Sequence, residues 1–231
     1  MAGLYILPSL LSPEGIDHIP GVVRSRIEKL RIFVVERTRT ARRFIRAILP
    51  DYPIDEASFF ELDKHDMLVS QAMIYKLLEQ RTDIGLISEA GTPCIADPGA
   101  MIVHMARKSN YKIYPLSGPS SIMLALMASS MNGQEFAFHG YLPIKEPALS
   151  HKLSQISSLA LSGATQIFIE TPYRNDKMIE KLGATIDANL TISISIDLTS
   201  VNEEHIITKP SKVKQISIGK RPAIYCIGKL Q

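Results

Sequence analysis

Three glutamates lie at or just after the ends of apolar runs that are typical of buried strands. They are Glu36, Glu89 and Glu170. Because ligands in α/β sheets bind at the carboxyl ends of the strands, we expect these three carboxylates to converge on one cleft. A carboxylate in such a cleft can act as a general base. The alternative is that each glutamate only caps a strand or a neighbouring helix.

The segment from Thr38 to Leu49 is predicted to be a helix with one buried face. Apolar residues recur there at helical spacing, namely Ala41, Phe44, Ile45, Ile48 and Leu49. The other face carries an arginine stripe of Arg39, Arg42, Arg43 and Arg46. Like charges so spaced lower helix stability unless an anion or an acidic surface compensates them. The stripe therefore indicates a surface that follows phosphates, to which guanidinium groups are well suited. The alternative is a solvated basic face.

Several kinds of active site lack the residues they would need. Neither Gly-x-Gly-x-x-Gly nor Gly-x-x-x-x-Gly-Lys-Ser/Thr occurs in the chain. The six histidines lack metal-binding spacing and the two cysteines, Cys94 and Cys226, are far apart, so we expect no metal site. The run from Ser117 to Ser121 is not a Gly-x-Ser-x-Gly nucleophile elbow, which argues against a serine hydrolase.

The composition indicates a globular protein of one large or two small domains. The chain has 231 residues, of which 45% are hydrophobic and 21% charged. Its longest apolar run, from Ile122 to Ala128, is far shorter than the ~20 residues that cross a bilayer, so no membrane span is expected. The N-terminus lacks the basic region of a secretory signal, and this together with the cysteine usage favours a cytoplasmic location. A net charge of +3 is too small by itself to argue for a polyanionic partner.

Loops rich in glycine, proline and serine follow three predicted strands. These strands span Gly3 to Leu7, Ile84 to Ile87 and Lys112 to Leu116, and a helix from Pro98 to Ser109 follows the second. Such loops hold ligands in open α/β sheets, and Gly91 and Gly99 would let the backbone approach a ligand closely. The alternative is a tight connection without a ligand.

The remaining elements predict two α/β domains. Helices are expected over Pro20–Leu30, Asp66–Arg81, Ile122–Ala128 and Pro147–Ser162, and strands over Ile32–Val35, Ser58–Leu62, Phe136–Gly140, Gln166–Glu170, Thr191–Ile196, His205–Thr208 and Ala223–Ile227. Strands and helices alternate in the first half, which predicts a parallel sheet. The second half is richer in strands and should contain antiparallel pairs, and Thr191–Ile196 alternates as a half-buried strand does. We expect domains at 1–117 and 118–231, with a ligand cleft between them.

The segment from Ser88 to Gly99 reads Ser-Glu-Ala-Gly-Thr-Pro-Cys-Ile-Ala-Asp-Pro-Gly. It resembles the S-D-A-G-T-P-G-I-S-D-P-G signature of the small-subunit ribosomal RNA cytidine 2′-O-methyltransferases, which belong to the tetrapyrrole methylase superfamily. Four shorter motifs of that family are matched in the expected order: E-D-T-R by Glu36-Arg37-Thr38-Arg39, G-P-S by Gly118-Pro119-Ser120, G-F-L-P-x-K by Gly140-Tyr141-Leu142-Pro143 with Lys145, and E-S-P-H-R by Glu170-Thr171-Pro172-Tyr173-Arg174. The resemblance extends from Gly3 to Gly228.

The resemblance implies a two-domain α/β methyltransferase with a mostly parallel N-terminal sheet and a mixed C-terminal sheet. Such a protein forms a homodimer, binds S-adenosylmethionine between its domains and needs no metal. By position, the cofactor-binding residues would be Pro8, Glu89, Ala90, Gly91, Ile95, Ala96, Asp97, Ser120, Ser121, Tyr141, Leu142 and Ala223. The expected substrate-binding residues are Arg42, Arg43 and Arg46 of the arginine stripe with Lys145, Glu170 and Arg174.

This sequence departs from the family pattern in three loops expected to face the methyl acceptor. The family's T-P-I-G-N-L after the first strand is replaced by a run from Leu7 to Ser12 without Gly-Asn-Leu. Its R-E-L-T-K appears as Ile196-Asp197-Leu198-Thr199-Ser200, and the acidic second position of E-D-T-R is Arg37.

Methyl transfer from a sulfonium is an in-line displacement, so the protein's main task is to position the nucleophile and exclude water. A ribose hydroxyl is a poor nucleophile and would benefit from a base, for which we expect Glu36, with Arg39 orienting a phosphate. The expected acceptor is therefore a ribose of small-subunit ribosomal RNA, and the expected partner is that RNA or the small ribosomal subunit. The alternatives are a methyltransferase acting on a tetrapyrrole or another small molecule, and a non-catalytic protein that binds RNA or the cofactor.

Overall fold

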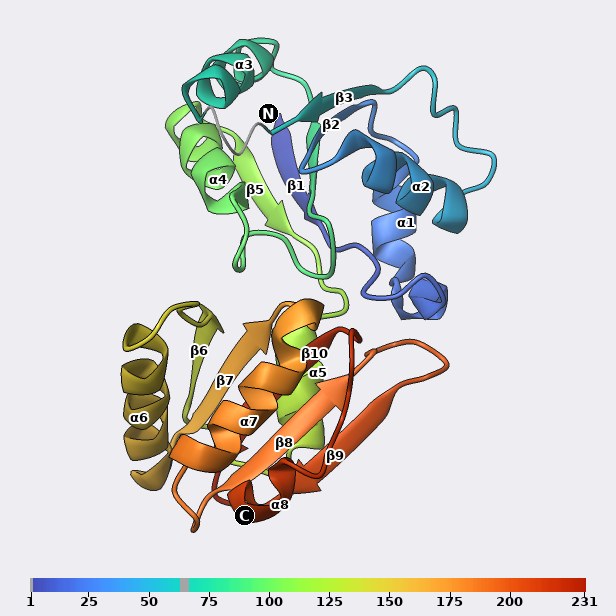
Figure 1. The fold of residues 1–231 in the computed structure, drawn as a ribbon. Coiled ribbons are helices and arrows are strands. Elements are labelled where there is room, and N and C mark those ends of the chain that lie inside the picture. Colours follow the sequence, from blue (N-terminus) through green and yellow to red (C-terminus); the bar gives the residue numbers. More distant parts are fainter. Residues whose placement is uncertain (1, 63–66) are drawn as a thin grey trace. The chain divides into compact units, whose positions relative to one another are not determined.

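The structure is a computed structural model that describes residues 2–62 and 67–231. The chain divides into two compact units, Met1–Ser120 and Ser121–Gln231 (Figure 1). The predicted boundary, after Ser117, lies in the same connecting segment. None of the helices in the described residues is long and apolar enough to cross a membrane.

Unit 1 is built on a five-stranded sheet in which every pairing is parallel. Its strands are β1 (Gly3–Leu7), β2 (Ile32–Val35), β3 (Ser58–Glu61), β4 (Ile84–Ile87) and β5 (Lys112–Pro115), in the spatial order β3-β2-β4-β1-β5. All residues of β1 and β4 are buried. Strands covered on both faces by helices read as continuous apolar runs, which is why β1 and β4 could be predicted from their sequences.

Helices cover both faces of this sheet and form two separate cores. The helices are α1 (Gly21–Ile27), α2 (Thr38–Ile48), α3 (Met67–Glu79) and α4 (Gly99–Lys108), with a short 3-10 helix η1 (Gly15–His18). Leu7 and Phe33 point to the core formed with α1 and α2, whereas Leu4 and Val34 point to the core formed with α3 and α4. This division follows from the alternation of side chains along a strand. The predicted helix over Asp66–Arg81 is present as α3, and the expected first residue lies outside the described residues.

Unit 2 contains a mixed sheet. Its strands are β6 (Phe136–Tyr141), β7 (Thr165–Glu170), β8 (Thr191–Ile196), β9 (Glu204–Thr208) and β10 (Ala223–Gly228), in the order β6-β7-β10-β8-β9. Only β6 and β7 pair in parallel; β10 occupies the centre and is antiparallel to both of its neighbours. The predicted α/β class, with a parallel first sheet and a mixed second sheet, is confirmed.

The helices of unit 2 include two that the sequence did not predict. They are α5 (Ser121–Ala128), α6 (Ala148–Leu161), α7 (Asn175–Thr185) and α8 (Pro210–Val213), with a 3-10 turn η2 (Pro172–Arg174). The two unpredicted helices are α7, which buries Met178, Ile179 and Leu182, and the short α8. The prediction that β8 is half-buried is wrong, since all six of its residues are buried. Helices α5 and α8 both contact β8, and its alternate isoleucines join the core that contains α6 and α7.

Candidate functional site

The loops after β1, β4 and β5 are hydrogen-bonded to one another at the carboxyl edge of the unit 1 sheet. The backbone N–H of Ser9 donates to the carbonyl of Gly91 at 2.8 Å, and the N–H of Gly91 donates to the carbonyl of Leu10 at 3.4 Å. The hydroxyl of Thr92 donates to the carbonyl of Pro119 at 3.1 Å. The three loops that the sequence placed at strand ends therefore lie together.

Two glycines in these loops make room for neighbouring loops. Gly91 has φ +67°, and a Cβ on it would lie 2.9 Å from Cδ2 of Leu11 and 3.3 Å from the carbonyl oxygen of Pro119. A Cβ on Gly118 would lie 2.2 Å from Cγ of Pro8. Neighbouring loops thus occupy the position that a Cβ on Gly91 would take, which leaves only the backbone of this residue to approach a ligand. These glycines are required for the loops to cross one another.

Two of the three strand-terminal glutamates meet in unit 1. Glu36 follows β2 and is buried, and its Oε1 accepts a hydrogen bond from the backbone N–H of Glu89 at 3.1 Å. Oε2 of Glu89 lies 3.7 Å from Nε of Arg37. Oε1 of Glu89 is buried and has no hydrogen-bond partner among the described residues. Because buried polar atoms are nearly always hydrogen-bonded, this oxygen is positioned to accept a hydrogen bond from a bound ligand.

Asp97 holds the loop between β4 and α4 in an uncommon conformation. Its carboxylate accepts hydrogen bonds from the backbone N–H groups of Cys94 at 2.8 Å and of Gly99 at 2.7 Å. Cys94 and Ala96 have φ angles of +71° and +63°, which residues with a Cβ rarely adopt. Burial raises the pKa of the Asp97 carboxyl above its usual value, and the charge of Glu36 adds to this effect, while the hydrogen bond from Gly99 opposes it. Strained residues of this kind cluster at ligand sites.

The other residues that the resemblance assigned to the cofactor differ in exposure. Pro8 is buried against Gly118, whereas Ala90, Ile95 and Ala96 are exposed. Ser120 and Ser121, which lie on either side of the division between the units, are half-buried.

In unit 2, the assigned residues gather at one edge of the sheet. Ala223 at the start of β10 pairs with Glu170 at the end of β7 and with Ile196 at the end of β8. Tyr141 at the end of β6 pairs with Ile169 and is 58% exposed. The side chain of Leu142 belongs to the core of unit 2, so a ligand could contact only its backbone.

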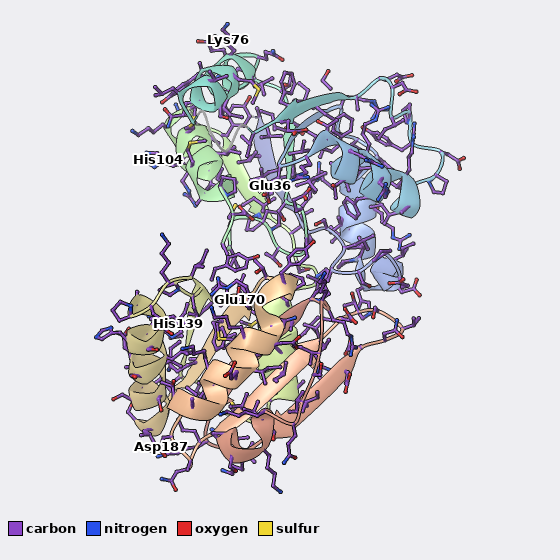
Figure 2. All side chains as sticks on the ribbon, in the orientation of Figure 1. Glu36, Lys76, His104, His139, Glu170 and Asp187 are labelled. Carbon is purple, nitrogen blue, oxygen red and sulfur yellow. The ribbon has the colours of Figure 1, made fainter. Side chains whose placement is uncertain are left out.

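Glu170 and Arg174 neutralise each other at this edge. The carboxylate of Glu170 is fully buried, and its Oε1 accepts the backbone N–H of Thr171 at 2.7 Å while Oε2 lies 3.1 Å from Nη2 of Arg174. Arg174 also donates to the carbonyl of Pro143 at 3.2 Å. Figure 2 labels Glu36 in unit 1 and Glu170 in unit 2. Both residues that the sequence assigned to substrate binding here thus also have a structural role in the turn after β7.

Sequence reasoning missed two residues that organise this edge, Asn175 and Arg221. The buried side chain of Asn175 donates to the carbonyls of Gly219 at 3.0 Å and of Arg221 at 2.7 Å, and its Oδ1 accepts the hydroxyl of Tyr225 at 3.0 Å. Its position directly after the Glu170–Arg174 motif was the available signal. Arg221 binds Asp197 at 2.6 Å, in the loop where the sequence departs from R-E-L-T-K.

The arginine stripe is not uniform. The guanidinium of Arg42 donates to the carboxylate of Asp55 and lies 5.5 Å from the ring centre of Phe59. Asp55 therefore supplies acidic compensation for one of the four like charges of the stripe. Arg39, Arg43 and Arg46 are exposed, as is Lys145 of unit 2. Within residues 2–62 and 67–231, no group of three or more His, Cys, Asp or Glu side chains could hold a metal ion.

Residues 13–214 match the protein family described as Tetrapyrrole (Corrin/Porphyrin) Methylases. The chain belongs to this family. The predicted family is thereby confirmed, and the loop carrying Glu89 and Asp97 and the edge carrying Glu170 both fall within the matched region of the tetrapyrrole methylase.

Relatives of this tetrapyrrole methylase include proteins named Ribosomal RNA small subunit methyltransferase I. The chain is 30% identical over 200 residues to the one from Vibrio cholerae, covering 87% of this chain and 66% of the relative. It is 28% identical over 226 residues to the one from Micromonospora olivasterospora, covering 94% and 68%. The chain thus spans about two thirds of the length of these relatives.

Solved structures of low sequence identity share the fold. Uroporphyrin-III C-methyl transferase from Thermus thermophilus, complexed with S-adenyl homocysteine, matches with a TM-score of 0.62 and 11% identity over 99% of this chain and 98% of the other. The methyltransferase CobJ matches with a TM-score of 0.67 and 12% identity, covering 99% and 95%.

Proposed function

We propose that this protein is an S-adenosylmethionine-dependent methyltransferase whose acceptor is a ribose 2′-hydroxyl of small-subunit ribosomal RNA. Family membership and the solved neighbour with S-adenyl homocysteine support the cofactor, and the names of the relatives support the acceptor. The observation that carries the proposal is the pair Glu36 and Glu89. The Glu36 carboxylate accepts the backbone N–H of Glu89 in one of three mutually bonded loops, and one buried oxygen of the Glu89 carboxylate has no hydrogen-bond partner among the described residues.

The residues of unit 1 fit such a cofactor. The unpartnered oxygen of Glu89 would accept a hydrogen bond from a hydroxyl or amino group of the cofactor. The exposed Ile95 and Ala96 offer apolar surface on the same loop, and Asp97 holds the backbone on either side of them. Pro8, Ala90, Gly91 and Ser120 complete the proposed contacts of unit 1, and Ser121, Tyr141, Leu142 and Ala223 are those proposed for unit 2. When bound, S-adenosylmethionine supplies an activated methyl group on a sulfonium.

For the acceptor, we assign the proton-accepting role to Glu36. The N–H of Glu89 fixes the orientation of the Glu36 carboxylate, and a fixed orientation is what a general base requires. Arg39 is exposed on the first turn of α2, three residues after Glu36, and would orient a phosphate of the RNA. Arg43 and Arg46 would extend that phosphate contact along the helix. In unit 2, we assign substrate contacts to Lys145, Glu170 and Arg174.

A second acceptor class is favoured by the loops that depart from the family pattern. The run Leu10-Leu11-Ser12 replaces Gly-Asn-Leu, and Ile196 and Ser200 stand where the family has Arg and Lys. A tetrapyrrole or another small acceptor would tolerate these changes. A protein that only binds the cofactor or RNA is the outcome if no methyl transfer occurs.

Transfer of a labelled methyl group decides between these functions. The substrate is small ribosomal subunits from a strain that lacks this gene, and subunits from the parent strain serve as the control because their site is already modified. We expect label in ribosomal RNA of the first sample only, recovered as a 2′-O-methylnucleoside after nuclease digestion. Label absent from RNA but present in a tetrapyrrole would assign the second class. Cofactor binding by calorimetry without any transfer would assign the non-catalytic class.

Three further properties are part of the proposal. We propose that the protein is a homodimer located in the cytoplasm and that it needs no metal. Sedimentation at micromolar concentration measures the first property. Cofactor affinity that stays constant after treatment with EDTA would support the last one.

A further inference from the structure

Tyr173 presents an exposed aromatic ring on a rigid turn of unit 2. Its side chain is 81% exposed, and the next most exposed aromatic among the described residues is Tyr141 at 58%. Such an exposed ring contributes little to the hydrophobic core, so the stability of unit 2 does not explain a tyrosine at this position. Tyr173 lies in the turn η2 directly after β7, at the sheet edge that carries Glu170 and Ala223.

The turn that carries Tyr173 is held on both sides. Before it, the backbone N–H of Thr171 is bonded to the buried carboxylate of Glu170. After it, Arg174 forms an ion pair with Glu170 and donates a hydrogen bond to the carbonyl of Pro143, and Asn175 is fully buried. An aromatic ring on a fixed turn loses little conformational freedom when a ligand stacks on it.

The ammonium group of Lys220 lies over one face of this ring, which leaves the other face for a ligand. Nζ of Lys220 is 5.3 Å from the ring centre of Tyr173. The two residues on either side of Lys220, Gly219 and Arg221, both give their carbonyls to the side-chain amide of Asn175. One buried amide, two residues after Tyr173, therefore connects the end of the turn to the backbone on both sides of Lys220.

We propose that Tyr173 and Lys220 form a stacking platform for one unpaired base of the RNA, with the ammonium group of Lys220 contacting a phosphate of the same strand. An exposed ring beside a positive charge is the combination that single-stranded nucleic acids recognise, because every base has a π-face and every nucleotide a phosphate. The inference rests on the proposed RNA acceptor and adds a binding site that neither the motifs nor the relatives assign.

Single-stranded RNA containing one 2-aminopurine tests the platform, because the fluorescence of this base is quenched when it stacks on an aromatic ring. We expect quenching on binding to the wild-type protein and to Tyr173→Phe. In Tyr173→Leu the quenching should be lost and the affinity should fall by roughly 5- to 150-fold, the range for removal of one stacking interaction. Tyr75→Leu is the matched control, because Tyr75 is an exposed tyrosine on α3 of unit 1, and it should behave as wild type.

Lys220→Gln tests the second member of the platform. It should keep the quenching but make the slope of log affinity against log salt shallower by about 0.7, the value for one phosphate contact on a single strand. Wild-type affinity and quenching in Tyr173→Leu would show that Tyr173 does not stack on a base. The proposal that RNA is the methyl acceptor would be unaffected. If the wild-type protein binds the cofactor but no RNA, both the proposed stacking platform and the proposed RNA acceptor are wrong.

Discussion

The carboxylate of Glu36 accepts the backbone N–H of Glu89 at 3.1 Å, which joins the end of β2 to the loop after β4. Substitution can distinguish the structural role of this hydrogen bond from the role of Glu36 as a base. A glutamine at position 36 can still accept the N–H of Glu89 but cannot take a proton from a hydroxyl. We therefore expect Glu36→Gln to lower kcat by roughly 10²- to 10⁴-fold with unchanged melting temperature and unchanged cofactor affinity.

Glu36→Ala removes the acceptor as well as the base. It should show the same decrease in kcat and, in addition, a decrease of about 1–3 kcal/mol in the free energy of unfolding, because the N–H of Glu89 loses its partner. Denaturant unfolding with single-turnover kinetics measures both. Near-normal turnover in Glu36→Gln would remove Glu36 from the reaction.

Gly118 and Pro8 define a contact between the loops after β5 and β1. A Cβ at position 118 would overlap the proline ring, so Gly118→Ala should destabilise the protein by roughly 1–3 kcal/mol and weaken cofactor binding. Pro8→Gly removes the overlapping atoms and should restore part of the stability in the double variant. Gly133→Ala is the control, since nothing lies within 4 Å of the added Cβ. If the stability changes of Gly118→Ala and Pro8→Gly are additive in the double variant, the two residues are not energetically coupled.

Arg42 is paired with Asp55, whereas Arg43 and Arg46 of the same helix are exposed, so their substitution should have different effects. Arg43→Ala combined with Arg46→Ala should make the salt dependence of RNA binding shallower by roughly 0.7 for each phosphate that the variant no longer binds. Arg42→Ala should leave that slope unchanged and lower stability by at most about 1 kcal/mol, because Arg42 pairs with the exposed Asp55. Fluorescence titrations at several salt concentrations measure the slopes. A wild-type slope in the double variant would make the stripe an ordinary solvated face.

His139 predicts a dependence of stability on pH. Its Nε2 lies 2.8 Å from Oε1 of Gln166 in a partly buried position, and burial lowers the pKa of the imidazole below its usual value, with the Gln166 bond opposing this shift (Figure 2). The unfolded chain then binds the proton more readily than the folded one, so stability falls as the pH drops below about 6.5. The melting temperature of the wild type should therefore fall more than that of His139→Gln between about pH 7.5 and about pH 5.5. Equal falls in both proteins would assign the pH dependence to other groups.

The sequence predicted the elements whose signal is local. The strands β1, β2, β4 and β8 have the bounds expected from their apolar runs, and the apolar face of α2 is buried as its spacing indicated. The helix α7 was missed because polar residues and Gly183 dominate its sequence, although Met178, Ile179 and Leu182 have helical spacing. The full burial of β8 depends on helices from other parts of the chain, which a pattern within six residues cannot report.

The candidate site shows the same limit. The position of the loop from Ser88 to Gly99 followed from its motif, and the meeting of Glu36 with Glu89 followed from their places at strand ends. Three contacts had no local signal: Arg42 with Asp55, Asn175 with Gly219, and Arg221 with Asp197. Each contact joins segments that are distant in the sequence. Each also involves a charged or amide side chain that, from the sequence alone, would be expected to face solvent.

The place of β10 at the centre of the unit 2 sheet has a consequence for synthesis on the ribosome. All five strands of unit 1 have been made once Pro115 has left the exit tunnel, whereas β7 and β8 have no strand between them until residues 223–228 have been made. Domains fold as units during translation, so we expect unit 1 to fold while unit 2 still exposes the edges of β7 and β8. Until β10 inserts, the unpaired N–H and C=O groups along those two edges are open to pairing with other chains.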